Sequence, residues 1–74
     1  MAYARITRDA KIMMGKPCIA GSRVTVEAIL EDLSDGMTIA QVLEAYDGLS
    51  EEDARAALDY AAAYLREESM IAAK

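Results

Sequence analysis

The chain has 74 residues, a formal net charge of −5, one cysteine and no histidine. At this length we expect a single domain, residues 1–74, whose folding buries only about 60% of the surface exposed in the unfolded chain. The lone Cys18 cannot form an intramolecular disulfide, and a zinc site would depend on one thiolate and carboxylates. We therefore expect no metal and no cofactor, and we expect oligomerisation to add burial to so small a core.

The charge is distributed unevenly along the chain. Residues 1–25 carry five cations and one acid, a net charge of +4, whereas residues 26–74 carry three cations and twelve acids, a net charge of −9. This asymmetry predicts a basic arm, residues 1–25, on an acidic body. No apolar run approaches the roughly 20 residues that a membrane span needs, and the N-terminus lacks a signal-peptide pattern. We expect a cytoplasmic protein without membrane contact.

The basic arm is rich in turns and short extended runs. Extended runs are predicted at residues 6–7, 18–19 and 23–24, and Gly15 and Gly21 define the turns that precede the last two. The runs at 18–19 and 23–24, joined through Gly21, predict a β-hairpin. Because an isolated hairpin is unstable in water, we expect it to pack on the helices that follow.

Two predicted helices follow the arm. The first, residues 26–35, begins after Thr25, a residue type common at N-caps. The second, residues 39–46, begins after Thr38, and Gln41 completes the pattern of a capping box. Apolar residues recur at helical spacing in both, so each helix has one face for a common core.

The third predicted helix, residues 51–68, is the longest and most apolar. Ser50 caps it, and three consecutive acids fill its first turn, where negative charge is favourable. Its apolar stripe consists of Ala54, Leu58, Ala61 and Leu65. This stripe is widened by Ala57, Tyr60 and Tyr64. A helix apolar on two sides is normally covered on two sides, which predicts a homodimer. The predicted dimer interface consists of Ala57, Tyr60, Ala61 and Tyr64.

Three amphipathic helices separated by tight turns predict a mainly α fold. The pattern favours a three-helix core of the homeodomain-like or winged helix-turn-helix type, with a short N-terminal β-hairpin or arm. Three-helix packing without a helix-turn-helix relation is the alternative, because periodicity fixes the faces of helices and not their connectivity in space.

The sequence offers little for catalysis, and we expect that the protein is not an enzyme. Cys18 has no histidine to activate it and is interpreted as a small packing residue. Helix capping explains the three acids of the third helix better than a cation site, because consecutive helical residues point in different directions. Residues 15–24 combine two glycines with Lys16 and Arg23, which fits either an anion grip or a plain hairpin with solvated cations.

A helix-turn-helix suggests DNA binding, but the charge of the third helix opposes its simplest form. The N-terminal half of that helix would face the DNA, and it carries three acids and one cation, Arg55. If DNA is bound, we expect the basic arm to bind it. The residues predicted to contact a toxin or nucleic acid are Arg5, Arg8, Lys11, Lys16 and Arg23.

Most of the chain resembles a widespread prokaryotic family. The resemblance is carried by residues 5–7 and 11–13, by the run GKPCIAGSRVTV at 15–26, and by residues 29–33, 36–38, 42–43, 46, 51–53, 55–58 and 60–61. The family is catalogued as domain of unknown function 433, and its members are described as predicted antitoxins of VapB-like, helix-turn-helix type.

The resemblance implies an antitoxin of a type II toxin–antitoxin system that binds and neutralises a PIN-like ribonuclease and regulates its own operon. It also implies a homeodomain-like fold, often dimeric, with Gly21 and Arg23 in its best-marked turn. A PIN-like nuclease holds metal ions with carboxylates, so we expect Lys16 or Arg23 to enter that acidic pocket. The alternatives are a DNA-binding regulator without a toxin partner and a structural homodimeric adaptor.

The chain departs from the resembled family in three loops. Ala10 stands where proline is frequent, Met14 where a second glycine is common, and Asp47 and Gly48 where a proline-containing pair is usual. These departures concern turns rather than the fold.

Overall fold

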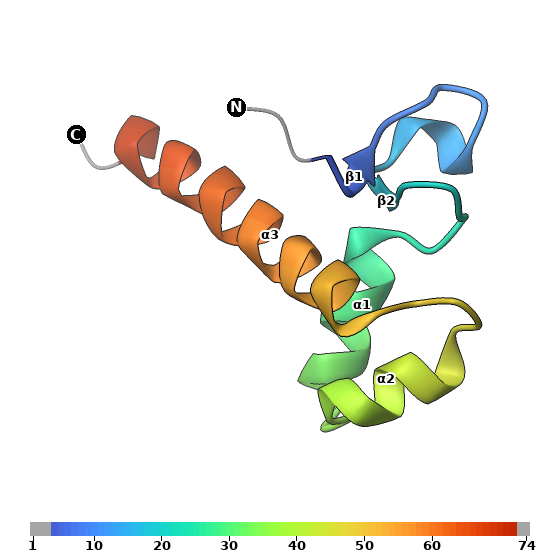
Figure 1. Ribbon diagram of the computed structural model, residues 1–74. Coiled ribbons are helices and arrows are strands. Elements are labelled where there is room, and N and C mark those ends of the chain that lie inside the picture. The colour runs from blue at the N-terminus through green and yellow to red at the C-terminus, as the bar shows by residue number, and fades with distance from the viewer. Residues whose placement is uncertain (1–3, 73–74) are drawn as a thin grey trace.

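A computed structural model describes residues 4–72, with side chains described up to residue 67. Within this range the chain is mainly helical with a small antiparallel sheet (Figure 1). The elements in chain order are β1 (Ile6–Thr7), the short 3-10 turn η1 (Met13–Gly15), β2 (Cys18–Ile19), α1 (Val26–Ser34), α2 (Ile39–Ala45) and α3 (Glu51–Ala72). In the described chain no helix is both long and apolar enough to cross a membrane.

The sheet differs from the predicted hairpin. The strand β2 pairs with β1 in the register Ile6 opposite Ile19, and not with residues 23–24. The predicted turn at Gly21 still forms, and in it the Ile19 N–H donates to the Val24 carbonyl over 2.9 Å. The segments on either side of this turn make one isolated β-bridge, between Cys18 and Thr25. The pairing with β1 buries both isoleucines, which sequence spacing could not reveal.

The helix starts agree with the predicted caps. The Thr25 hydroxyl accepts the Ala28 N–H over 3.0 Å. At α2 the Thr38 and Gln41 side chains each accept the other residue's N–H, which completes a capping box. At α3 Ser50 and Asp53 form the same reciprocal pair, with both distances 3.1 Å. Satisfying these first-turn N–H groups fixes where each helix begins.

The helix ends differ by a few residues from the predicted ones. The helices α1 and α2 end at Ser34 and Ala45, one residue before the predicted ends, because Asp35 and Tyr46 are the C-caps. Conversely α3 continues to Ala72, beyond the predicted residue 68. A helix rich in alanine has no strong local stop signal, so its end is poorly marked in the sequence.

The core lies where the sheet and the three helices meet. Its buried apolar residues are Ile6, Ile19, Val26, Ile29, Val42 and Ala57. The Tyr46 hydroxyl donates to Oδ2 of Asp32 over 2.8 Å, which links the end of α2 to α1 on the edge of this core. Cys18 is also buried, as expected of a packing residue.

Only part of the predicted apolar stripe of α3 reaches the core. Ala54 and Ala57 are fully buried, whereas the side chains of Leu58 and Leu65 are 37% and 60% exposed. The chain's own fold therefore covers only part of this stripe. Small residues face α1 and α2 because the helices approach closely there, and the larger side chains turn outward. The C-terminal part of α3 projects away from the other helices (Figure 1).

Candidate functional site

Two of the five predicted contact cations hold the basic arm to the helices. The Arg5 guanidinium lies 3.0 Å from Oδ1 of Asp53 in the first turn of α3. The Lys16 ammonium lies 3.1 Å from Oε1 of Glu27 in the first turn of α1. The arm's cations thus neutralise acids at two helix starts, which reduces what they offer to a partner.

The other three cations form no ion pair with a described residue. The Arg8 Nε donates to the Gly15 carbonyl over 3.1 Å and closes the loop between β1 and β2. Lys11 and Arg23 are exposed, and no residue of the described range makes a hydrogen bond or ion pair with either side chain. Of the five, these two are therefore the most accessible to an anionic partner.

The loop between the strands contains an unusual left-handed turn. Met13, Met14 and Gly15 have φ angles of 50°, 57° and 83°. Gly15 and Gly21, the two residues predicted to define turns, both have positive φ, but Met13 and Met14 adopt it without glycine's freedom. Met14 occupies the position where the resembled family often has glycine, and its side chain is 86% exposed.

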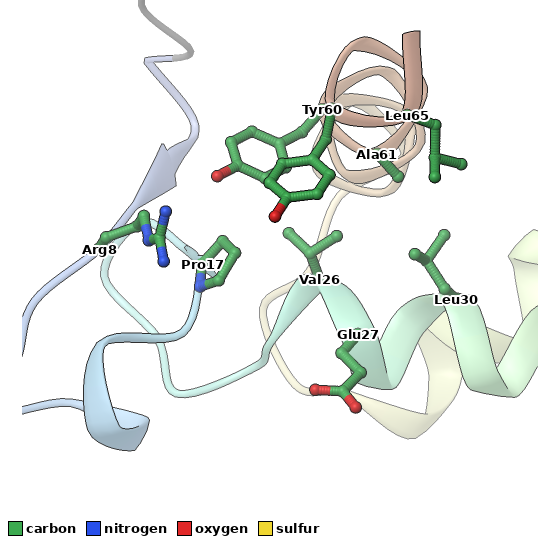
Figure 2. Close-up of a pocket in the computed structure, with 9 residues that line it drawn as sticks. Arg8, Pro17, Val26, Glu27, Leu30, Tyr60, Ala61 and Leu65 are labelled. Carbon is green, nitrogen blue, oxygen red and sulfur yellow. The ribbon is translucent and has the colours of Figure 1, made fainter. Parts of the chain in front are cut away.

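An open groove of about 350 Å³ lies between α1, α3 and the arm (Figure 2). It is lined by Arg8, Pro17, Val26, Glu27, Leu30, Tyr60, Ala61, Tyr64 and Leu65. Figure 2 shows Tyr60 and Ala61 on the α3 side, facing Val26 and Leu30 of α1. The groove lies on the side where α3 extends away from α1 (Figure 1).

The groove is apolar with charge at its rim. Apart from Arg8 and Glu27, its lining side chains are hydrocarbon or aromatic. A concave apolar surface with a few charges is suited to holding apolar side chains of a ligand or partner, because burying them removes hydrocarbon from water.

The structure divides the predicted dimer-interface residues. Ala57 is fully buried in the chain's own core and presents no surface to a partner. Tyr60 and Ala61 are half-buried and line the groove, together with Tyr64, which is 59% exposed. The sequence reasoning missed Pro17 and Leu30 as groove residues, because their local pattern indicates only a turn and a core-facing helix.

Two titratable groups outside the groove have shifted pKa values. Burial raises the pKa of Asp53, but hydrogen bonds from Ser50 and Arg5 and the charge of Arg5 outweigh it, so the pKa lies below the ordinary 3.8. The hydrogen bond to Asp32 raises the pKa of Tyr46 above 10.0, with burial and nearby carboxylates acting in the same direction. In the folded chain Asp53 thus favours its charged form and Tyr46 its neutral form.

The described residues contain no group of three or more cysteine, aspartate or glutamate side chains placed to hold a metal ion. The Cys18 thiol lies 3.4 Å from the Lys16 carbonyl oxygen, inside the fold.

Comparison with known proteins assigns most of the chain to one family. A family model described as "Protein of unknown function (DUF433)" matches residues 6–61. No curated protein and no solved structure matches the chain.

Proposed function

The chain belongs to the DUF433 family of proteins of unknown function, and from this premise and its groove we propose that it is a protein-binding antitoxin. It binds and neutralises a PIN-like ribonuclease, without catalysis of its own. The observation that carries the proposal is the apolar groove between α1 and α3.

The groove supports protein binding through its composition and its place. Leu30, Tyr64 and Leu65 form apolar walls that water contacts in the free chain. A partner that inserts apolar side chains here removes both surfaces from water, at about 25 cal/mol per Å² of hydrocarbon. Arg8 and Glu27 at the rim provide charges of both signs, which can fix the partner's orientation.

The accessible cations support contact with an acidic nuclease site. Of the two cations predicted to enter that site, Lys16 is paired with Glu27, whereas Arg23 is exposed in the turn after β2. Lys16 would have to leave Glu27 first, and breaking that ion pair would offset part of the binding free energy of the new contact. Arg23 is therefore the cation that we assign to the carboxylate pocket of the ribonuclease.

DNA binding through α3 has weaker support. If α2 and α3 act as a helix-turn-helix, the first turn of α3 would approach the phosphates. There Arg55, the only cation of that half of the helix, lies 3.0 Å from Glu51, and Asp53 and Glu52 add further negative charge. Like charges facing the phosphates oppose binding, so operon regulation would depend on Lys11 and Arg23 of the arm.

Co-purification with the product of the neighbouring gene tests the proposal. We expect a complex that suppresses the neighbour's ribonuclease activity, and we expect Tyr64→Ala to raise the dissociation constant about tenfold by removing one groove wall. Met14→Ala is the matched control, since it also removes an exposed apolar side chain but lies outside the groove. If the parent chain neither binds nor inhibits the neighbour, the proposed function is wrong.

A further inference from the structure

A second apolar surface lies on the outer face of α3, and it borders the groove at Leu65, which belongs to both. Leu58 and Leu65 are partly exposed there, at 37% and 60%, and Ala62 is exposed between them. At 3.6 residues per turn, both leucines lie about 40° to 60° to one side of Ala62. The fold itself leaves this strip of three apolar residues uncovered.

Two opposite charges flank the same strip. Asp59 and Arg66 lie about 60° and 40° from Ala62 on the side away from the leucines. Both are exposed, and neither has a hydrogen-bond or ion-pair partner among the side chains of residues 4–67. The outer face thus has an apolar edge and a charged edge that run parallel along the helix.

This face is complementary to itself when two helices run antiparallel. A two-fold axis beside Ala62 keeps the apolar edge of one helix against the apolar edge of its mate. With a rise of 1.5 Å per residue, Leu58 comes within about 1.5 Å of the level of the mate's Leu65. On the other edge, Asp59 comes equally close to the level of the mate's Arg66. The small side chain of Ala62 allows the helices to approach at the axis.

We propose that the outer face of α3 binds a second copy of this chain in this antiparallel arrangement, with the two-fold axis beside Ala62. The charge pattern identifies the occupant, because the acid of each copy meets the cation of the other. Each association forms two Leu58–Leu65 contacts and two Asp59–Arg66 ion pairs. The interface leaves Ala57 in the core and leaves Tyr60 and Tyr64 on the groove side.

This arrangement does not depend on the proposed function. It leaves Tyr60 and Tyr64 outside the interface but shares Leu65 with the groove, so the dimer contact borders the groove. One helix pair is smaller than a standard interface of about 800 Å² per partner, so we expect a dimer that dissociates on dilution.

A charge swap in the full-length chain tests the pairing directly. In analytical ultracentrifugation over a range of concentrations, Asp59→Arg alone and Arg66→Asp alone should each raise the dimer dissociation constant about tenfold or more, because like charges then face each other. The double variant Asp59→Arg/Arg66→Asp restores opposite charges and should dimerise like the parent. Glu67→Arg is the control, since it reverses a charge on the same helix about 140° from Ala62.

A cross-link tests the position of the two-fold axis. Ala62→Cys should form a disulfide-linked dimer under mild oxidation, because the two positions 62 meet at the axis. Ala63→Cys, about 100° further round the helix, should not. The native Cys18 is buried and should remain unlinked in both variants.

Either of two results would overturn the proposal. One is a parent chain that stays monomeric at the highest soluble concentration. The other is a double charge swap that fails to restore the dimer lost in the single variants while circular dichroism shows all of them folded. Neither measurement requires the ribonuclease, so a failed dimer is distinguishable from a failed antitoxin.

Discussion

The guanidinium of Arg5 and the carboxylate of Asp53 lie 3.0 Å apart, although 48 positions separate them in the chain. Arg5 directly precedes β1, and Asp53 stands in the first turn of α3. The same carboxylate accepts the Ser50 N–H over 3.1 Å, so one residue both caps the longest helix and holds the basic arm against it. The acids of this first turn therefore have an intramolecular role beyond their favourable interaction with the helix dipole.

We expect the cap to matter more than the ion pair. Asp53→Ala removes both and should lower the free energy of unfolding by about 1 to 2 kcal/mol. Arg5→Ala removes only an ion pair whose arginine is half-exposed, and should cost less than about 1 kcal/mol. Urea denaturation at neutral pH measures both. Equal losses would show that the ion pair dominates.

The lowered pKa of Asp53 predicts a loss of stability in acid. The folded state favours the charged carboxylate, so its contribution is complete above the ordinary value of 3.8 and disappears as the pH falls through the lower folded pKa. Asp53→Asn should flatten the fall in unfolding free energy below about pH 5. Urea midpoints measured at several acidic pH values check this, and an unchanged slope would assign the acid sensitivity to other carboxylates.

The left-handed turn at Met14 should be sensitive to the shape of the substituted residue. Met14→Val places a β-branched side chain at a φ of 57° and should cost about 1 to 2 kcal/mol. Met14→Gly removes the strain but adds freedom to the unfolded chain, and should gain about 0.5 kcal/mol. Because the side chain is 86% exposed, thermal denaturation compares the backbones with little change in burial. Valine tolerated as well as methionine would contradict the turn.

The hydrogen bond from Tyr46 to Asp32 should stabilise the contact between α1 and α2. Tyr46→Phe leaves the ring and removes the bond, which we expect to cost about 1 to 2 kcal/mol at neutral pH. The raised pKa of Tyr46 means that its contribution is complete below 10.0 and is lost as the pH rises through the folded value. The deficit of the variant in urea denaturation should therefore shrink in alkali. Tyr64→Phe, at an exposed position, should change little.

Ala57 and Tyr64 were predicted to share one interface, but substitutions at the two positions should change the free energy of unfolding by different amounts. Ala57→Leu overfills a fully buried site and should cost about 1 to 3 kcal/mol of unfolding free energy. Tyr64→Ala should leave stability within about 0.5 kcal/mol, because its side chain is largely exposed. Denaturation of the two variants at low protein concentration separates core from surface. A neutral Ala57→Leu would place this residue outside the core.

Features set by neighbouring residues were predictable from the sequence. The caps at Thr25, Thr38 and Ser50 require only a side-chain oxygen and N–H groups within three residues. The split into a basic arm and an acidic body, and the burial of Cys18, could likewise be inferred from local pattern.

Contacts between distant segments required the tertiary structure. Helical periodicity marked Leu58 and Leu65 as apolar but could not decide which face of α3 its neighbours cover, and it could not show that β2 pairs with β1 rather than with residues 23–24. The groove follows from the angle at which α3 leaves α1, which depends on the small residues Ala54 and Ala57 at their contact. Local hydrogen bonds determine where each helix begins, whereas the surfaces available to partners depend on how the helices pack. Helix packing formed the groove and left the outer face of α3 exposed.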